Sequence, residues 1–305
     1  MTVFTLPNPH SLEESIAKKL EANFACNTEW HHYSNGEWML RVLRTPKKAI
    51  VLGRTEAPGD NLVQTLTVID TLKRNGAKDI TLVLPYFGYS RQDHVTRKGD
   101  HLPADLLTTL FKHCGATRIV TVDLHNSLTQ KNSPIPLISI DIFPEYATAF
   151  KKTGERSDVL TIVSPDHGSK HRADAFRDLF DRSVPICWLE KQRNQKTGTV
   201  HSKKLFGEKQ GTTALIVDDI CDTGGTVKEC VRHLKKNGFT TFYLCITHPV
   251  FSGTAIQTLC ALKFKKIFVS NTIPLSSDVQ KKLPLSIIDV TPILLTICKK
   301  VMIWM

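Results

Sequence analysis

Residues 214–226 constrain the fold more than any other stretch of this 305-residue chain. An apolar run at 214–217 is followed by two carboxylates, Asp218 and Asp219, and then by a loop of small and hydroxyl residues at 222–226. This order predicts a buried strand, a tight loop and the N-terminus of a helix. Backbone N–H groups and the positive end of a helix dipole converge at such a loop, so we expect it to bind a phosphate group.

The residues around this loop indicate which phosphate compound it binds. Open α/β sheets place their ligands at the carboxyl ends of their strands, and carboxylates there suit the vicinal hydroxyls of a sugar. We therefore predict a ribose 5-phosphate site made by Asp218, Asp219, Asp222, Thr223, Gly224, Gly225 and Thr226. The alternative is a glycine-rich turn with ordinary helix caps, which does not need two carboxylates before the loop.

Length, charge and cysteine spacing narrow the class of protein. A chain of 305 residues favours two domains, and a formal charge of +11 favours anionic partners. The lysines are dispersed in pairs without a long basic block, so we expect no nucleic-acid partner. Eight cysteines without Cys-x-x-Cys or zinc spacing indicate reduced thiols in a cytoplasmic protein. The apolar tail at 287–305 is too interrupted to span a membrane, so we expect a docking helix there and no membrane partner.

A repeat links the two halves of the chain. Residues 72–76 (Leu-Lys-Arg-Asn-Gly) match residues 234–238 (Leu-Lys-Lys-Asn-Gly), and an apolar strand that ends in proline follows each copy. Further helices are expected at 106–114 and 255–262. The predicted fold class is therefore α/β, with two duplicated domains, each a mainly parallel sheet flanked by helices.

Three further segments have recognisable local patterns. Ser11 is expected to cap a helix over 11–25, with Glu14 completing a capping box. The pair at 35–36 (Asn-Gly) predicts the turn of a β-hairpin. The polar, basic segment at 189–199 is predicted to be a mobile surface loop.

Other loops at predicted strand ends carry candidate ligands. Arg91 and Gln92 are suited to the phosphates and base of a nucleotide. His125 is either a metal ligand or a buried, hydrogen-bonded histidine, and Asp166 is either a metal ligand or a helix cap. Their local sequences leave both alternatives open.

These motifs occur in the same order in the ribose-phosphate diphosphokinases, which make phosphoribosyl diphosphate (PRPP) from ribose 5-phosphate and ATP. The sequence resembles that family from about residue 33 to the tail. Residues 217–226 resemble its ribose 5-phosphate signature, and 86–93 resemble its nucleotide loop Pro-Tyr-x-x-Tyr-x-Arg-Gln-Asp. Residues 123–125 and 164–166 resemble the segments whose His and Asp hold catalytic magnesium.

Two more segments extend the resemblance and imply residue roles. Residues 191–193 resemble the Lys-x-Arg of the family's flexible catalytic loop, and 33–37 resemble a segment that reaches into a neighbouring subunit's ATP site. The implied catalytic residues are Lys191 and Arg193. The implied ATP-binding residues are Tyr33, Asn35, Glu37, Arg91, Gln92 and His94, and the implied Mg²⁺ ligands are His125 and Asp166.

The resemblance also implies the reaction and the organisation of the chain. The β,γ-diphosphoryl group of ATP would pass to the C1 hydroxyl of ribose 5-phosphate, giving PRPP and AMP for nucleotide biosynthesis, with Mg²⁺ as cofactor. Self-association is expected, from a dimer up to a hexamer. Phosphoribosyltransferase-like domains are expected at 1–145, on the ATP side and joined by a helix at 288–305, and at 146–287, with the ribose 5-phosphate site and the catalytic loop.

Two other functions compete with this interpretation. A phosphoribosyltransferase that consumes PRPP would share the loop at 222–226, but it needs only one such domain. A catalytically silent regulatory paralogue would bind active subunits, but it has no need to retain the implied catalytic and metal-binding residues. We therefore favour the diphosphokinase.

The sequence departs from the family at four points. His94 stands where the family usually has a basic residue, so one ATP-facing cation becomes titratable. Ser169 replaces a glycine of the Ser-Pro-Asp-x-Gly-Gly segment, and Tyr33 replaces a phenylalanine that stacks on adenine. The sequence lacks the Ser/Tyr-rich tail that forms a phosphate and ADP regulatory site, so we do not expect that regulation.

Overall fold

The structure is a computed structural model that describes residues 2–20, 28–92, 95, 97–193 and 200–303. The chain divides into two compact units: the first comprises Met1–Ile140 and Val290–Met305, and the second comprises Asp141–Asp289. No helix of the described part is long and apolar enough to cross a membrane.

The first unit is built on a five-stranded parallel sheet. Its strands lie in the order β1 (Thr2–Thr5), β4 (Lys48–Leu52), β5 (Asp79–Leu84), β6 (Arg118–Val122) and β7 (Leu137–Ile140). In β4, every residue after Lys48 is buried. Such continuous apolar strands are typical of a parallel sheet that is covered on both faces.

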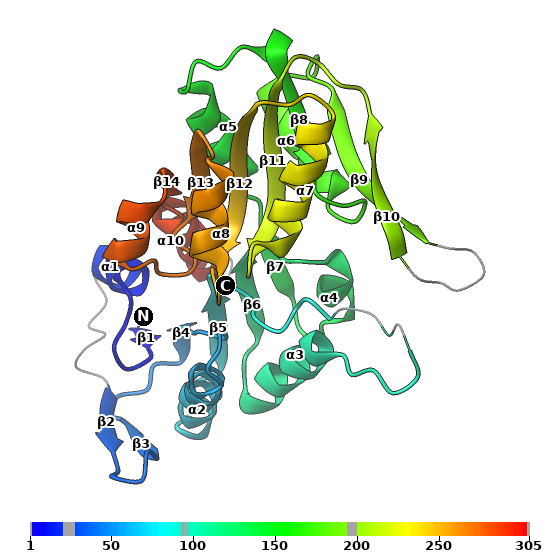
Figure 1. The fold of residues 1–305 in the computed structure, drawn as a ribbon. Helices are drawn as coiled ribbons and strands as arrows, with labels where there is room; N and C mark the ends of the chain where they lie inside the picture. The colour runs from blue at the N-terminus through cyan, green and yellow to red at the C-terminus, as the bar shows by residue number, and fades with distance from the viewer. Residues whose placement is uncertain (1, 21–27, 93–94, 96, 194–199, 304–305) are drawn as a thin grey trace. The chain divides into compact units, whose positions relative to one another are not determined.

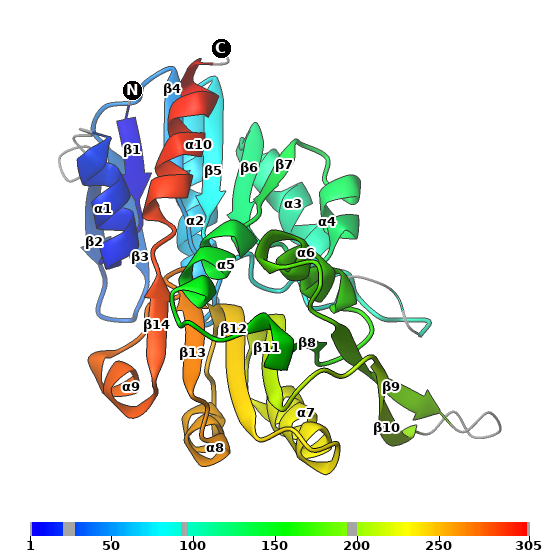
Figure 2. The same cartoon turned by 90° about the horizontal axis from the view of Figure 1, so that it is seen from above.

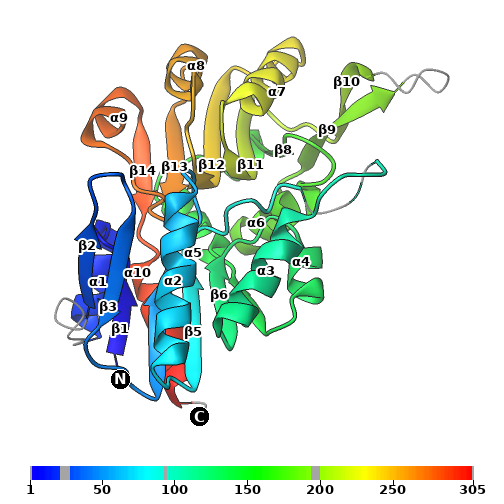
Figure 3. The same cartoon turned by 90° about the horizontal axis from the view of Figure 1, so that it is seen from below.

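Helices cover both faces of this sheet. Figures 2 and 3 show α2 (Asp60–Arg74) and α3 (Pro103–Cys114) on one face and α1 (Ser11–Lys19) and α10 (Thr291–Ile303) on the other. The short helix α4 (Ser127–Asn132) follows β6. In α2, residues Thr65, Val68, Ile69 and Leu72 are buried, at the spacing of one helical face.

A separate antiparallel hairpin is formed by β2 (Thr28–His32) and β3 (Trp38–Val42). In its turn, Asn35 Oδ1 accepts a hydrogen bond from the Glu37 N–H at 3.0 Å, and the Tyr33 N–H donates to the Glu37 carbonyl at 2.8 Å. The predicted hairpin turn is confirmed.

The second unit contains a seven-stranded sheet. Its order is β10 (Val200–Gly207), β9 (Ile186–Arg193), β8 (Leu160–Ser164), β11 (Thr213–Cys221), β12 (Thr241–Pro249), β13 (Lys266–Ser270) and β14 (Leu285–Ile288). All neighbouring strands are parallel except β9 and β10. The sheet therefore consists of a five-stranded parallel core, from β8 to β14, with a two-stranded extension at one edge.

Helices again cover both faces. Figures 1 and 3 show α7 (Gly225–Lys236) and α8 (Ala255–Leu262) on one face and α5 (Phe143–Lys151) and α6 (Lys170–Phe180) on the other. Two short segments complete the unit: η1 (Ser157–Val159) and α9 (Ser277–Lys282).

The two units repeat one chain order. The series β4–α2–β5–α3–β6 of the first unit corresponds to β11–α7–β12–α8–β13 of the second (Figure 1). The predicted α/β class with two duplicated, mainly parallel domains is confirmed.

The predicted N-cap of the first helix is wrong. Helix α1 is preceded by His10, whose N–H donates to Glu13 Oε2 at 3.0 Å, and Ser11 is already helical. The capping interaction therefore starts one residue earlier than expected. Glu13 can make it because its carboxylate is held inside the protein, 3.6 Å from Arg54 Nε.

The predicted loop at 189–199 is also wrong for its first five residues. Residues 189–193 belong to β9 and pair with β10, and residues 194–199 lie outside the described part. Trp188 and Phe206 are cross-strand partners with stacked rings 6.0 Å apart. This packing with a distant segment overrides the polar local composition.

Candidate functional site

Strand β11 places two carboxylates at its carboxyl end. Residues 213–217 are buried, and successive side chains then alternate between the faces of the sheet. Asp219 is only 3% exposed, whereas Asp218 is partly exposed. The two neighbouring aspartates therefore have different environments.

The loop after β11 leads directly into α7. Gly224 precedes the helix with a left-handed φ of 78°, which glycine adopts without strain, and Gly225 is the first helical residue. Thr223, Gly225 and Thr226 are exposed. The loop thus presents exposed hydroxyls and a helix N-terminus, the features that a phosphate site requires.

The connection between β12 and α8 holds this loop in place. The Phe251 N–H donates to the Cys221 carbonyl at 3.0 Å, and the Ser252 hydroxyl donates to Asp222 Oδ1. Sequence reasoning missed both residues, because nothing in 250–254 resembles a ligand-binding motif.

A buried arginine pairs with the second aspartate of β11. Arg172 Nη2 lies 3.3 Å from Asp219 Oδ2, and the two side chains are 3% and 4% exposed. Arg172 comes from α6, where Ala173 and Phe176 are also buried. Arg172 was not predicted from the sequence, although an arginine on a buried helical face needs a partner.

Negative charge accumulates around Asp218. Desolvation is the main cause that raises the pKa of this carboxyl well above its ordinary value, and the charges of Asp219 and Asp166 raise it further. Arg172 opposes these effects. Three carboxylates near one guanidinium leave a site that favours a cation or hydroxyl donors.

Asp166 has one oxygen engaged in a cap and a second oxygen that remains available. Its Oδ1 accepts hydrogen bonds from the Ser169 N–H and hydroxyl, both at 2.8 Å. Among the described residues, none donates a hydrogen bond to Oδ2. The substituted residue Ser169 thus orients Asp166, and the capping role does not prevent Oδ2 from binding a metal.

The other candidate metal ligand lies in the first unit. His125 is partly exposed, in the turn between β6 and α4, and Asn126 Oδ1 caps α4 by accepting from the Leu128 N–H at 2.9 Å. Within the described ranges, no three His, Cys, Asp or Glu side chains gather to enclose a metal ion. Magnesium does not require such a cage, because it usually keeps several water ligands.

The candidate ATP residues of the first unit lie on two elements. Tyr33, Asn35 and Glu37 are exposed in the hairpin turn. Tyr33 is 47% exposed, and its ring is at a T-shaped angle to that of His31. Arg91 and Gln92 lie in the loop after β5.

Thr55 anchors that loop near its start. Its hydroxyl donates to the Tyr86 carbonyl at 2.8 Å and accepts from the Gly88 N–H at 2.7 Å. The prediction for His94 lies outside the described residues. Lys191 and Arg193 belong to β9, where they pair with Lys203 and Val200 of β10.

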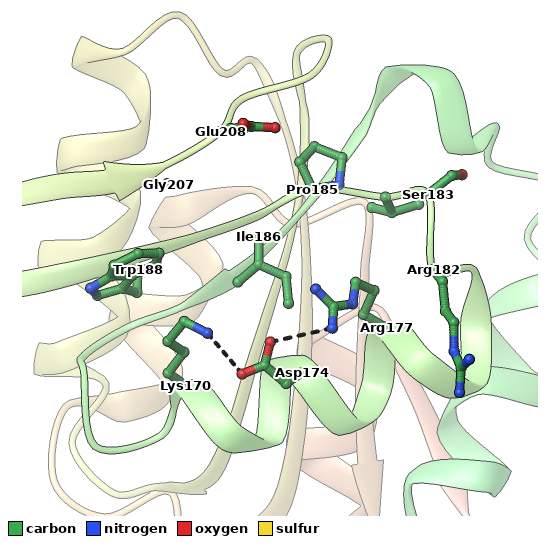
Figure 4. A pocket seen from close by; sticks show the side chains of 11 residues that line it. Lys170, Asp174, Arg177, Arg182, Ser183, Pro185, Ile186, Trp188, Gly207 and Glu208 are labelled. Atoms are coloured by element: carbon green, nitrogen blue, oxygen red, sulfur yellow. Dashed lines mark hydrogen bonds and ion pairs between the residues drawn. The ribbon is translucent and has the colours of Figure 1, made fainter.

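A pocket of about 420 Å³ lies between α6 and the β9–β10 ribbon of the second unit. Three of its charged groups form ion pairs with one another: Asp174 contacts Lys170 Nζ at 2.8 Å and Arg177 Nη2 at 3.6 Å (Figure 4). Lys170 Nζ also lies 5.3 Å from the centre of the Trp188 ring. None of the predicted substrate residues lines this pocket.

Comparisons with known proteins agree with the duplicated fold. Residues 1–115 match the family model for the N-terminal domain of ribose phosphate pyrophosphokinase, and residues 146–260 match that of the phosphoribosyl transferase domain. The chain is 34% identical over 282 residues to a ribose-phosphate pyrophosphokinase of Halalkalibacterium halodurans, and 33% identical over 283 residues to one of Corynebacterium ammoniagenes. Both matches cover 91% of this chain and 87% of the relative.

A solved structure is similar over nearly the whole chain. The phosphoribosylpyrophosphate synthetase of Mycobacterium smegmatis superposes with a TM-score of 0.89 at 29% identity, covering 99% of this chain and 98% of that one. Sequence and structure agree in both units. The chain therefore belongs to the ribose-phosphate pyrophosphokinase family of enzymes.

Proposed function

We propose that this enzyme transfers the β,γ-diphosphoryl group of ATP to the C1 hydroxyl of ribose 5-phosphate, giving PRPP and AMP for nucleotide biosynthesis. The observation that carries the proposal is the end of β11. Two carboxylates stand there directly before an exposed loop that enters the N-terminus of α7. Phosphate and vicinal hydroxyls are therefore recognised side by side on one short segment.

Ribose 5-phosphate would be bound by the second unit. Thr223 and Thr226 supply exposed hydroxyls to its phosphate, and Gly225 and Thr226 contribute backbone N–H groups from the first turn of α7, at the positive end of the helix dipole. Asp218 and Asp219 are proposed to accept hydrogen bonds from the sugar hydroxyls. Asp222 is held by Ser252 at the entrance of the loop.

ATP would be bound by the first unit. Arg91 and Gln92 follow β5, and Tyr33, Asn35 and Glu37 form the tip of the hairpin. The hairpin tip is exposed, which supports its contact with the ATP site of a second copy of the chain. We accordingly propose a self-associating cytoplasmic enzyme, from a dimer up to a hexamer.

Mg²⁺ is the proposed cofactor, with Asp166 and His125 as its protein ligands. Asp166 fits this role, because its Oδ2 accepts no hydrogen bond from the described residues and its surroundings are negatively charged. A bound Mg²⁺ neutralises charge on the phosphates of ATP. Lys191 and Arg193 are proposed to stabilise the charge that develops on the transferred group.

One assay separates this function from its alternatives. Purified enzyme is incubated with ATP, Mg²⁺ and ribose 5-phosphate, and AMP release is measured with and without the sugar. We expect AMP only when ribose 5-phosphate is present. A phosphoribosyltransferase and a silent paralogue would both release no AMP, and only the phosphoribosyltransferase would consume PRPP in a second incubation to which PRPP is added.

Two variants link the activity to the site. Asp218→Asn removes a carboxylate at the end of β11 and should raise the KM for ribose 5-phosphate by about tenfold or more, because hydrogen bonds to charged groups contribute about 1.5–3 kcal/mol. Asp278→Asn removes an exposed carboxylate of α9 that pairs with Lys282 at 2.7 Å, and it should leave the KM unchanged. If both substitutions change the KM for ribose 5-phosphate equally, Asp218 does not belong to the sugar site.

A further inference from the structure

Thr55 joins two loops of the first unit at the carboxyl end of its sheet. It lies in the loop after β4, and its hydroxyl donates to the Tyr86 carbonyl at 2.8 Å and accepts from the Gly88 N–H at 2.7 Å, in the loop after β5. The register of β4 and β5 ends at the pair Leu52 and Val83. The Thr55 hydroxyl therefore connects the two chain segments where their backbone pairing has ended.

The backbones of these two loops also pack closely. A Cβ at Gly88 would collide with the Thr55 carbonyl oxygen, so the approach requires a residue without a side chain. Thr55 is 0% exposed. Phe87, 2% exposed, packs against the Phe111 ring of α3, with 6.3 Å between the ring centres. The start of the loop after β5 is therefore held both by Thr55 and by the core.

A short turn leads from this fixed point to the candidate nucleotide ligands. Residues 88–91 form the turn, in which the Ser90 hydroxyl donates to the Phe87 carbonyl at 2.9 Å. Arg91 is exposed at the end of the turn, and the partly exposed Gln92 follows it. The place of both side chains thus depends on where the turn begins.

We propose that Thr55 is a positioning residue for the ATP site: its hydroxyl fixes the start of the loop after β5, and this loop in turn presents Arg91 and Gln92 to the nucleotide. The inference rests on the proposed function. It gives the loop after β4 a task of its own. This loop supports its neighbour, whereas its counterpart after β11 is proposed to bind phosphate.

The second unit contains the same kind of contact between the corresponding loops. There the Ser252 hydroxyl, in the connection after β12, donates to Asp222 Oδ1, in the loop after β11. In each unit, a hydroxyl of one loop holds the neighbouring loop that carries the proposed ligands. The direction is reversed, because the proposed ligands follow β5 in the first unit but follow β11, the counterpart of β4, in the second.

A purely structural hydroxyl is the competing explanation, and three variants separate the two. Thr55→Val keeps the shape of the side chain but removes the hydroxyl from the Tyr86 carbonyl and the Gly88 N–H. Thr55→Ser keeps the hydroxyl. The matched control is Thr161→Val, because the equally buried Thr161 hydroxyl donates to the Gln210 carbonyl at 2.8 Å and accepts from the Gln210 N–H at 2.9 Å. Thr161 lies near the start of β8, at the opposite end of the strand from the proposed ligands.

Steady-state AMP release gives both KM values, and thermal melting gives stability. If the loss of the hydroxyl lowers to about a tenth the fraction of molecules whose loop is ready to bind, the KM for ATP rises about tenfold. We expect this rise in Thr55→Val, with the KM for ribose 5-phosphate unchanged. Thr55→Ser should keep the KM for ATP near that of the wild type. Thr161→Val should melt at a lower temperature, because buried backbone groups lose a hydrogen bond, and should keep both KM values.

A Thr55→Val enzyme whose KM for ATP stays within about twofold of the wild type would overturn the inference, and so would an equal rise of this KM in Thr161→Val. If Thr55→Val does not fold, Thr55→Cys takes its place, because a thiol is only a weak donor and acceptor, and its KM for ATP should rise about threefold or more. A wild-type enzyme that releases no AMP would instead contradict the proposed function. The two failures are therefore distinguishable.

Discussion

The hydroxyl of Ser252 donates a hydrogen bond to Oδ1 of Asp222, and this contact ties the β12–α8 connection to the loop at 222–226, the proposed phosphate loop. Asp222 is negatively charged and stands beside a site that we propose binds a phosphate. A carboxylate that turned toward the phosphate would repel it. Ser252 therefore helps to keep the loop open to an anion.

Replacement of Ser252 by alanine should weaken ribose 5-phosphate binding. Hydrogen bonds to charged groups contribute about 1.5–3 kcal/mol, so we expect the KM for the sugar to rise by about tenfold or more while the KM for ATP stays constant. Steady-state kinetics measure both. The control is Ser276→Ala, because Ser276 caps α9 by accepting from the Val279 N–H. An unchanged sugar KM in Ser252→Ala would show that this contact does not serve the site.

The two glycines of the phosphate loop should differ in their tolerance of a side chain. At Gly224, a Cβ would lie 3.2 Å from Thr258 Cγ2 and the φ of 78° is left-handed, so Gly224→Ala should lower the free energy of unfolding by about 1–2 kcal/mol. At Gly225, a Cβ would meet only Thr223 Oγ1, at 3.6 Å. Urea unfolding should therefore show little loss for Gly225→Ala. If both variants lose the same free energy of unfolding, the left-handed φ of Gly224 is not the reason why this position requires glycine.

Glu13 should make stability depend on pH. It is 2% exposed, and burial raises its pKa to about 7, although the charge of Arg54 opposes the shift. Between about pH 4.5 and 7, the folded state keeps a proton that the unfolded state has lost, so the free energy of unfolding should fall as pH rises, by up to about 3 kcal/mol.

The comparison that isolates this effect is Glu13→Gln, measured by urea unfolding across the same pH range. The variant should lose most of the slope. His10, whose pKa is lowered by burial and by Arg54, acts in the opposite sense and is present in both proteins. If the free energy of unfolding changes with pH in the same way in both proteins, Glu13 is not the cause of the pH dependence.

Lys191 and Arg193 should affect turnover far more than binding. If both cations meet charge that develops in the transition state, Lys191→Ala and Arg193→Ala should each lower kcat on the order of a thousandfold and change either KM little. Lys204→Ala on neighbouring β10 is the control and should leave kcat unchanged. A loss of less than about tenfold in both variants, with unchanged melting, would refute the catalytic assignment.

The features that sequence reasoning recovered are local ones. The phosphate loop is a single segment whose carboxylates, glycines and hydroxyls follow one another, so its strand, turn and helix could be predicted without knowing any partner. The bounds of α8 agree with the predicted range 255–262, and the helix predicted at 106–114 lies within α3, because both are periodic apolar segments with clear ends. The match between residues 72–76 and 234–238 was enough to indicate duplication.

The features that escaped prediction depend on distant partners. The buried ion pair of Arg172 forms only when α6 packs on β11 and brings Asp219 within reach. The strand at 189–193 exists because β10 supplies its hydrogen-bond partners, whereas its own composition is that of a loop. The N-cap of α1 is His10, and not the predicted Ser11, because Glu13 is held in the interior near Arg54 and accepts a hydrogen bond from the His10 N–H.

The central claim is that a diphosphoryl group moves as one unit, and ATP labelled in its β-phosphate tests it most directly. With Mg²⁺ and ribose 5-phosphate, the account predicts that the label is recovered in PRPP and that unlabelled AMP forms in equal amount. Recovery of the label in ADP would show transfer of the γ-phosphate alone. That result would contradict the assignment of this chain as a ribose-phosphate diphosphokinase.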